Sequence, residues 1–242
     1  MSTIVENKAC ISRLYFSNRL NKNESFVKDY KLVIFDWDGT VMDSIGRIVD
    51  SMQAAAKSAN LAIPSEEAVK GIIGLSLAKA VGLLFPSITE QQITELAKAY
   101  KHHYMEVSTV STPLFRNAFE LLTQLQSAEK TLAVATGKAR EGLNRLMAVS
   151  NTTEFFSASK TADEAESKPH PDMILKLLAE LDIAAEDAVM IGDSIHDLTM
   201  ANNAGVDAIG VTYGAHDKED LLALKPVAIV DDMFELEKLL VS

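Results

Sequence analysis

The 242-residue sequence predicts an α/β protein in which a parallel sheet is interrupted, after its first strand, by a small all-helical module. Two observations predict this arrangement. Short apolar runs alternate with segments of helical periodicity along most of the chain, which is typical of parallel strands joined by helical crossovers. Between residues 45 and 112 the alternation stops, because that stretch contains helical segments but no run typical of a strand.

The predicted strands are short, rich in aliphatic side chains and bounded by polar or glycine residues, as expected of strands that are buried on both faces. In each of the first three predicted strands, a polar residue stands within two positions after the last strand residue. Because the carboxyl ends of parallel strands meet at one edge of a sheet, these polar residues are expected to lie close together. In chain order the predicted strands cover residues 32–35, 132–135, 188–191, 208–211 and 227–230.

Helical periodicity fills the spaces between the strands and the whole of the insertion. A connection as long as this insertion is usually functional rather than a plain loop. We therefore expect residues 1–29 to form an N-terminal extension, residues 30–44 and 113–242 to form the α/β core, and residues 45–112 to form the helical module. The predicted helices cover residues 45–58, 66–71, 76–84 and 90–107 in the module, and 118–128, 141–148, 171–181 and 195–204 in the core.

Composition and charge exclude several classes of protein. Hydrophobic residues make up 48% of the chain and charged residues 24%, as in ordinary globular domains, so the chain as a whole is not disordered. A formal net charge of −11 would repel nucleic acids and anionic membranes, and neither is an expected partner. A single cysteine, Cys10, cannot form an internal disulfide, and no apolar run is typical of a membrane span or a signal peptide. We expect a cytoplasmic protein.

Two aspartates follow directly on the first predicted strand. In an extended chain Asp36 and Asp38 point to the same side, at the edge of the sheet where α/β proteins bind ligands. Carboxylates held close together repel one another unless a cation or a proton intervenes, so this pair favours a hard divalent ion such as Mg²⁺. The alternative is a simple turn, since Asp38-Gly39 is a common turn signal.

A second acidic segment follows the strand predicted at 188–191. Asp193 is a candidate ligand for the same metal ion. If a helix begins near Ser194, Asp197 lies in its first turn, where it resembles the acidic member of a capping box. Capping and support of the metal are both open for Asp197.

A candidate anion site follows the strand predicted at 132–135. Thr136 offers a small hydroxyl, Gly137 permits close approach of the backbone, and Lys138 comes just before a helical segment. Such turns also occur for geometry alone. Lys168, in a proline-containing loop, could offset the charge of a phosphate that is bound beside several aspartates.

Together these segments resemble the haloacid dehalogenase superfamily of phosphatases, in the branch similar to phosphoglycolate phosphatases. The four motifs of the family occur in order, and the resemblance runs from about Lys31 to the C-terminus. It implies a Rossmann-like core, and the helical module at 45–112 resembles the family's cap domain, which covers the site and helps to select the substrate. The matching segments are Asp36 to Ser44, Thr136-Gly137, Lys168-Pro169, and Gly192-Asp193 with Asp197.

The resemblance implies a Mg²⁺-dependent phosphatase that hydrolyses a small phosphorylated metabolite, of the phosphoglycolate or sugar phosphate type. It implies that Asp36 is the nucleophile and forms an aspartyl-phosphate, and that Asp38 is the general acid and base. Mg²⁺ would be held by the side chains of Asp36 and Asp193 and by the backbone carbonyl of Asp38. Three further roles follow from the resemblance: Thr136, Gly137 and Lys168 would bind the phosphoryl oxygens, Lys168 would act in catalysis, and Asp197 would support the metal.

Departures from the family pattern bear on the alternatives. Related phosphomutases have a His beyond the second motif-one aspartate, whereas this chain has Arg47 and Ile48 in that region, which counts against a phosphomutase. Dehalogenase members lack the second aspartate, which this chain keeps. A non-hydrolytic phospho-aspartyl regulatory protein is the alternative from another class, and the long insertion argues against it.

Contacts that select the substrate are expected from Arg47 and from the turn around Gly74 in the helical module. The identity of the substrate is left open by the sequence, because fold and superfamily do not determine it. Either a monomer or a homodimer is consistent with the sequence. The apolar residues Leu14, Tyr15 and Phe16 leave open whether the N-terminal extension packs on the core.

Overall fold

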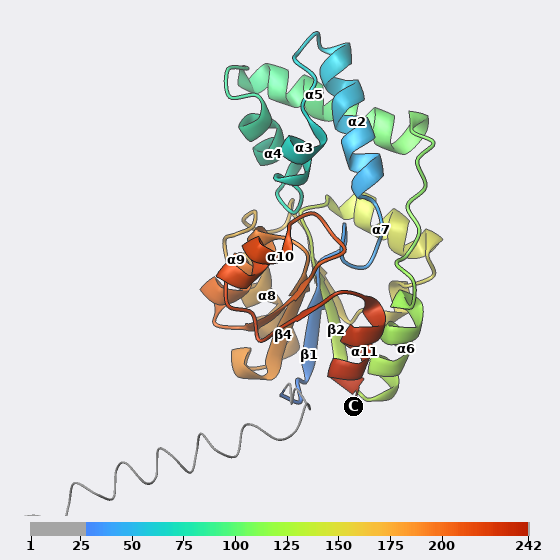
Figure 1. Ribbon diagram of the computed structural model, residues 1–242, viewed down its shortest axis with the longest axis vertical. Coiled ribbons are helices and arrows are strands. Elements are labelled where there is room, and N and C mark those ends of the chain that lie inside the picture. The colour runs from blue at the N-terminus through green and yellow to red at the C-terminus, as the bar shows by residue number, and fades with distance from the viewer. Residues whose placement is uncertain (1–27, 242) are drawn as a thin grey trace, which may run out of the picture.

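A six-stranded, fully parallel sheet forms the centre of the larger part of the molecule in the computed structural model, which describes residues 28–241 (Figure 1). The strand order is β3-β2-β1-β4-β5-β6, which confirms the predicted α/β fold. Almost the whole predicted N-terminal extension, including Leu14, Tyr15 and Phe16, lies outside the described residues. The strands are β1 (Leu32–Phe35), β2 (Thr131–Ala135), β3 (Ala158–Lys160), β4 (Ala188–Gly192), β5 (Asp207–Val211) and β6 (Ala228–Val230).

Strand β1 is buried on both faces, as its unbroken apolar sequence predicts. Its side chains alternate between two hydrophobic clusters: Val33 and Phe35 pack in one, and Leu32 and Ile34 in the other. This strand pairs with β2 on one side and β4 on the other, so the residue that follows Phe35 lies at the middle of the sheet's carboxyl edge.

Helices cover both faces of the sheet (Figure 1). The helices α6, α7 and α11 contribute to the cluster that contains Val33, and α8, α9 and α10 contribute to the cluster that contains Leu32. The predicted helices are present with small shifts at their ends, and β3, α10 and α11 are additional. Their bounds are α6 (Ala118–Ser127), α7 (Arg140–Val149), α8 (Asp172–Leu181), α9 (Ile195–Ala204), α10 (Lys218–Ala223) and α11 (Met233–Val241).

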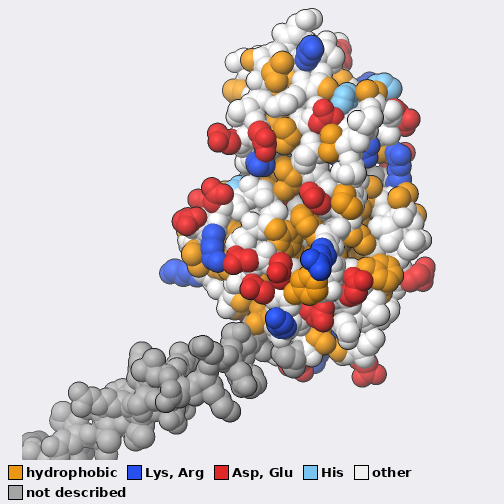
Figure 2. Space-filling model, turned by 45° about the vertical axis from the view of Figure 1, so that its right-hand side comes forward, with side chains coloured by type: hydrophobic (Ala, Val, Ile, Leu, Met, Phe, Trp, Pro, Cys, Tyr) orange, Lys and Arg blue, Asp and Glu red, His pale blue; other side chains and the backbone are white. Residues whose placement is uncertain are grey.

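Residues 45–112, which lie between β1 and β2, are mostly helical and lie over the carboxyl edge of the sheet (Figure 1). We call residues 45–112 the helical insert. Its apolar residues form a third cluster, separate from the two that flank the sheet. Hydrophobic side chains are visible on the surface between the narrower insert and the wider core (Figure 2). The helices of the insert are α2 (Ile45–Ser58), α3 (Glu66–Lys70), α4 (Leu77–Leu84) and α5 (Glu90–His102).

The helix predicted at residues 90–107 is divided in the structure. Thr89 begins α5 with a capping box that includes Gln92, and the α-helical hydrogen bonding continues to His102. The chain then forms a π-helical turn, η1 (His103–Val107), in which Tyr104 is buried. A π-turn inserts one residue into the helical repeat, so it changes the direction in which the following side chains point. Within the part of the chain that the structure describes, every helix is too short or too polar to cross a membrane.

Candidate active site

A cavity of about 540 Å³ lies between the carboxyl edge of the sheet and the helical insert. Six of the residues to which the sequence assigns a catalytic, metal-binding, phosphate-binding or substrate-selecting role line it. They come from the ends of two neighbouring strands and from two places in the insert. These residues are Asp36, Asp38, Thr136 and Gly137 of the core, and Arg47 and Gly74 of the insert.

Three carboxylates converge at the sheet edge beside this cavity. Oxygen atoms of Asp36, Asp193 and Asp197 lie within 4.8 Å of one another, and all three side chains are buried. Asp36 Oδ2 is buried and has no hydrogen-bond partner within residues 28–241. Asp36 follows β1 and Asp193 follows β4, so the pairing of these strands brings together two side chains that are far apart in the sequence.

Lys168 supplies the positive charge in this cluster. Its ammonium group lies 2.5 Å from Asp36 Oδ1 and 2.5 Å from Asp197 Oδ1, and its side chain is fully buried. Burial alone would lower the pKa of Lys168, but the two carboxylates raise it overall. One lysine therefore faces three aspartates.

Excess negative charge makes it unfavourable for all the carboxylates to ionise. Burial raises the pKa of Asp36, and repulsion from Asp197 and Asp193 raises it further, against the opposing effect of Lys168. Burial, followed by the charge of Asp197, raises the pKa of Asp193 to about 7. A divalent cation would offset this charge, and carboxylate oxygens are the ligands that Mg²⁺ prefers.

The Asp193 carboxylate is fixed by hydrogen bonds and by two glycines. Thr40 Oγ1 donates to Oδ1 over 2.9 Å, and the backbone N–H of Ala215 donates to Oδ2 over 2.7 Å. A Cβ atom at Gly39 would lie 2.2 Å from Asp193 Oδ2, and one at Gly214 would lie 2.1 Å from Asp193 Cβ. Gly39 also has a φ of +86°, which side chains disfavour. The close packing therefore requires glycine at both positions.

Asp197 takes the capping role that the sequence leaves open, and its carboxylate also lies beside Asp36 and Asp193. Its Oδ2 accepts from the backbone N–H and the hydroxyl of Ser194, at 3.1 and 2.6 Å, and completes a capping box at the start of α9. Its Oδ1 faces Lys168. The start of α9 thus orients the carboxylate that holds the lysine.

The Asp38 side chain is not part of this carboxylate cluster and has its own partners. Its Oδ1 accepts a 2.6 Å hydrogen bond from Ser44 Oγ, and its Oδ2 lies 3.0 Å from Lys138 Nζ. Lys138 also lies 4.8 Å from the centre of the Tyr104 ring in the insert. Burial would lower the pKa of Lys138, but Asp38 raises it overall. The sequence places Lys138 in an anion-binding turn and does not predict this ion pair.

The turn at Thr136 and Gly137 touches the insert directly. A Cβ atom at Gly137 would lie 2.4 Å from the carbonyl oxygen of Gly74 and 2.5 Å from that of Leu75. Thr136 is buried, and its hydroxyl accepts from the backbone N–H of Lys138 over 3.2 Å. Glycine at position 137 is therefore needed for close contact between the core and the insert.

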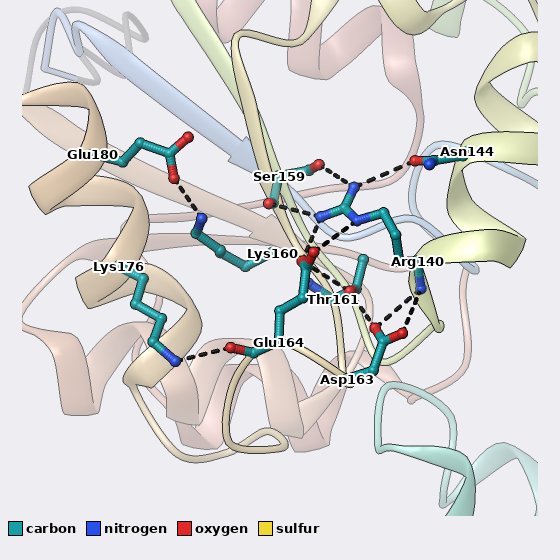
Figure 3. Close-up of polar contacts among 9 residues, drawn as sticks. All are labelled: Arg140, Asn144, Ser159, Lys160, Thr161, Asp163, Glu164, Lys176 and Glu180. Atoms are coloured by element: carbon teal, nitrogen blue, oxygen red, sulfur yellow. Dashed lines mark hydrogen bonds and ion pairs between the residues drawn. The ribbon is translucent and has the colours of Figure 1, made fainter.

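The loop that leads from β3 to Lys168 is tied to the start of α7 by Arg140 (Figure 3). The guanidinium group donates to Glu164 Oε1 over 3.0 Å and to the hydroxyl and carbonyl oxygens of Ser159, at 2.7 and 3.0 Å. The backbone N–H of Arg140 donates to Asp163 over 3.0 Å. Because α7 follows the turn at Thr136, this network fixes the position of that turn relative to the loop that carries Lys168.

Substitution Glu164→Gln tests this network through its dependence on pH. Hydrogen bonds from Arg140 lower the pKa of Glu164 from its ordinary 4.5 to about 2. A carboxyl whose pKa is lower in the folded state stabilises the protein above pH 4.5 and loses that contribution as the pH falls towards 2. We expect the free energy of unfolding, measured in urea between pH 5 and 3, to fall less steeply in the variant than in the wild type.

The control for this measurement is Glu120→Gln. Glu120 is exposed on α6 and forms no hydrogen bond or ion pair with the described residues. In this control the free energy of unfolding should fall with pH as steeply as in the wild type. Equal slopes in the wild type and in Glu164→Gln would show that the Arg140 network does not act on stability through Glu164.

Comparison with known proteins identifies a family and several relatives to which this chain is similar. The family model described as "Haloacid dehalogenase-like hydrolase" matches residues 33–211. The chain is 35% identical over 209 residues to "Probable phosphatase IndB" of Dickeya dadantii, which covers 85% of this chain and 91% of that protein. It is 29% identical over 208 residues to "Pyrophosphatase PpaX" of Bacillus cereus, with 84% and 93% covered.

Solved structures show the same fold. A predicted phosphoglycolate phosphatase from Haemophilus somnus is 27% identical and superposes with a TM-score of 0.78, over 88% of this chain and 98% of that one. A predicted phosphatase from Clostridium acetobutylicum is 25% identical, also with a TM-score of 0.78, over 87% and 98%. Both cover nearly all of the residues that the structure describes.

Proposed function

Because the chain belongs to the haloacid dehalogenase-like hydrolase family, we propose that it is a Mg²⁺-dependent phosphatase that hydrolyses a small phosphate monoester through an aspartyl-phosphate on Asp36. Membership confirms the resemblance drawn from the four motifs. The proposal includes the division expected from the sequence, with residues 30–44 and 113–242 as the core and residues 45–112 as the cap that covers the site.

The observation that carries the proposal is the setting of Asp36. It lines the cavity, one of its oxygens is paired with a buried lysine, and the other is buried with no partner. Burying a carboxylate oxygen without a hydrogen bond is costly, so such an atom in a native site calls for a functional explanation. A carboxylate that is to form a bond with phosphorus needs a free oxygen that faces the substrate.

The carboxylate cluster fits Mg²⁺. The raised pKa of Asp193 and the surplus of aspartates over lysine both favour a bound dication. Asp36 and Asp193 would hold it with their side chains and Asp38 with its backbone carbonyl, while Asp197 supports the site. When bound, Mg²⁺ would supply positive charge beside the phosphoryl group and so reduce repulsion between two anions.

In the first chemical step an oxygen of Asp36 attacks phosphorus. The new bond joins that oxygen to phosphorus, and the bond between phosphorus and the ester oxygen breaks. The leaving oxygen takes a proton from Asp38, whose carboxyl group lines the same cavity. Lys168, the hydroxyl of Thr136 and the backbone N–H of Gly137 hold the other phosphoryl oxygens as charge moves between them.

In the second step water attacks the phosphorus of the aspartyl-phosphate. Asp38 takes a proton from that water, the bond between phosphorus and Asp36 breaks, and inorganic phosphate leaves. Atoms and charge balance over the two steps, because the proton that Asp38 gives to the alcohol returns to it from water. Asp36 ends as the carboxylate with which it began.

The direct test is the release of inorganic phosphate from a panel of phosphate monoesters, with Mg²⁺ or with a chelator. The proposal expects turnover of at least one ester, dependent on the metal. A product that keeps its phosphate at a different position would instead indicate a phosphomutase. A phosphoenzyme that forms but does not turn over would indicate a phospho-aspartyl regulatory protein.

Metal binding can also be measured without turnover. We expect Mg²⁺ to raise the thermal unfolding midpoint of the wild type in a saturable way, because the three carboxylates converge only in the folded state. Asp193→Asn removes one of them and should abolish most of that rise.

The matched control for the metal measurement is Asp43→Asn. This exposed aspartate belongs to the same segment as Asp36 but lies outside the cluster. It should keep the wild-type response to Mg²⁺. No response in the wild type, or a full response in Asp193→Asn, would contradict the assigned metal ligands.

A further inference from the structure

Two residues of the helical insert that line the cavity carry a buried polar atom with no hydrogen-bond partner among the described residues. These atoms are Nε of Arg47, on α2, and the hydroxyl of Tyr104, on η1. The guanidinium carbon of Arg47 lies 5.4 Å from the centre of the Tyr104 ring, so the two side chains are neighbours. Native proteins satisfy nearly all buried donors, and two unsatisfied donors on neighbouring residues of a cavity wall indicate an acceptor that belongs to a ligand.

The charge of Arg47 is also uncompensated. Among the residues that the structure describes, no carboxylate forms an ion pair with it, and its Nη2 donates over 2.5 Å to the neutral carbonyl oxygen of Ser108. Lys138, which faces the same Tyr104 ring, is instead paired with Asp38. Burial raises the pKa of the Tyr104 hydroxyl, which therefore stays a hydrogen-bond donor at neutral pH.

We propose that Arg47 and Tyr104 bind a second anionic group of the substrate, a carboxylate or a phosphate on the leaving-group side of the ester. This assignment rests on the proposed phosphatase function and narrows its substrate class to phosphate monoesters that carry a second oxyanion. The guanidinium fork matches the planar geometry of a carboxylate and also the oxygens of a phosphate. The tyrosine hydroxyl supplies one further donor to the same group.

Contacts along the cavity wall connect Asp38 to the Arg47–Tyr104 pair. The Asp38 carboxylate lies 3.0 Å from Lys138 Nζ, and Lys138 Nζ lies 4.8 Å from the centre of the Tyr104 ring. Because Asp36 and the Arg47–Tyr104 pair line one cavity, a single ligand can contact both. Ile48 and Met52 on α2 add apolar side chains to this lining.

The kinetic test compares 2-phosphoglycolate with ethyl phosphate, which lacks the carboxylate. The measured quantity is the ratio of the two kcat/KM values, because a general loss of activity or folding cancels in that ratio. The wild type should prefer 2-phosphoglycolate, and Arg47→Met should lower the ratio by at least about tenfold, the scale of a charged hydrogen bond. Tyr104→Phe should lower the ratio of the two kcat/KM values by a smaller factor. The ratio for Arg47→Lys should lie between those of Arg47→Met and the wild type.

The matched control is Arg116→Met. The Arg116 guanidinium also lies 5.4 Å from an aromatic ring, that of Phe234, but in the core and outside the cavity. Losing this arginine removes a contact of the same kind, and the ratio should stay at the wild-type value. A fall of equal size in Arg116→Met would show that the effect of Arg47→Met is a general one.

A binding measurement identifies the preferred anion without turnover. Isothermal titration in the presence of Mg²⁺ compares 3-phosphonopropionate, which carries a carboxylate, with 1,2-ethylenediphosphonate, which carries a second phosphonate, and with propylphosphonate, which carries neither. At least one of the two probes that carry a second anionic group should bind the wild type at least about tenfold more tightly than propylphosphonate. Arg47→Met should remove that difference in affinity.

The outcomes separate the two proposals. If the wild type hydrolyses esters but the ratio is the same in Arg47→Met, the anion subsite is wrong and the phosphatase function stands. If no ester is hydrolysed, but the probes with a second anionic group bind more tightly than propylphosphonate and lose this preference in Arg47→Met, the phosphatase function is wrong and the anion subsite stands. Equal binding of all three probes to the wild type overturns the subsite in either case.

Discussion

Substitution Asp36→Asn should lower phosphate release by about a thousandfold or more. The amide has nearly the same shape as the carboxylate, but it has no charged oxygen with which to attack phosphorus. In the wild type Asp36 lines the cavity, and its Oδ2 is buried with no partner among the described residues. The measurement is steady-state release of inorganic phosphate from the best ester of the panel, with saturating Mg²⁺.

Asp43→Asn serves as the control here too, because Asp43 is exposed and lies outside the cavity. It should retain activity close to that of the wild type. Acid-quenched wild-type enzyme should contain a phosphoryl group that hydroxylamine releases, as expected of an acyl phosphate, and Asp36→Asn should not. Retention of more than a tenth of the wild-type rate by Asp36→Asn would rule out Asp36 as the nucleophile.

Lys168→Met should cause the largest loss of stability among these variants and a large loss of activity. Methionine is of similar length, so the chief change is the loss of Lys168 as the only cation, among residues 28–241, that forms an ion pair with Asp36 and Asp197. Removing one partner of a fully buried ion pair costs about 3–5 kcal/mol, because the other charge is left without compensation. The measurement is the free energy of unfolding in urea at pH 7.

The pH dependence gives this variant a distinctive signature. Without Lys168 the carboxylates of the cluster hold protons more tightly when folded than when unfolded, as Asp193, with a pKa near 7, already does in the wild type. A folded state that binds more protons gains stability as the pH falls. The deficit of Lys168→Met relative to the wild type should therefore shrink between pH 7 and pH 5.

The control is Lys176→Met, which breaks a surface ion pair with Asp172 on α8. Exposed pairs contribute little, and the loss should stay below about 1 kcal/mol. If Lys168→Met were no less stable than this control, the buried lysine would not be needed to offset the aspartate cluster.

Most of the sheet could be predicted from the sequence because its strands are continuous apolar runs. β1 and β4 are buried along their whole length. Apolar runs that are this short and this aliphatic favour a buried strand. β3 was not predicted, since its three residues, Ala158 to Lys160, are partly polar and only partly buried. An edge strand of this kind is stabilised by its pairing with β2, which local sequence does not reveal.

The convergence of Asp36 with Asp193 was predictable for a related reason. Both residues follow directly on strands that are neighbours at the centre of a parallel sheet, so topology alone brings them together. The pairing of Lys138 with Asp38, and the contact of both Lys138 and Arg47 with Tyr104, were not predictable. They depend on how the helical insert lies over the sheet, and on a π-turn that no periodicity in the sequence indicates.

The topology of the sheet also has a consequence for the order of folding. Leu32 in β1 is in register with Thr131 in β2 and Ala188 in β4, so the central strand can pair only after two long segments of chain have closed. The contacts within the helical insert, such as those between α2 and α5, close shorter segments of chain and should form sooner. During refolding, helix formation should precede the burial of Trp37 beside β1, and enzymatic activity should return together with that burial.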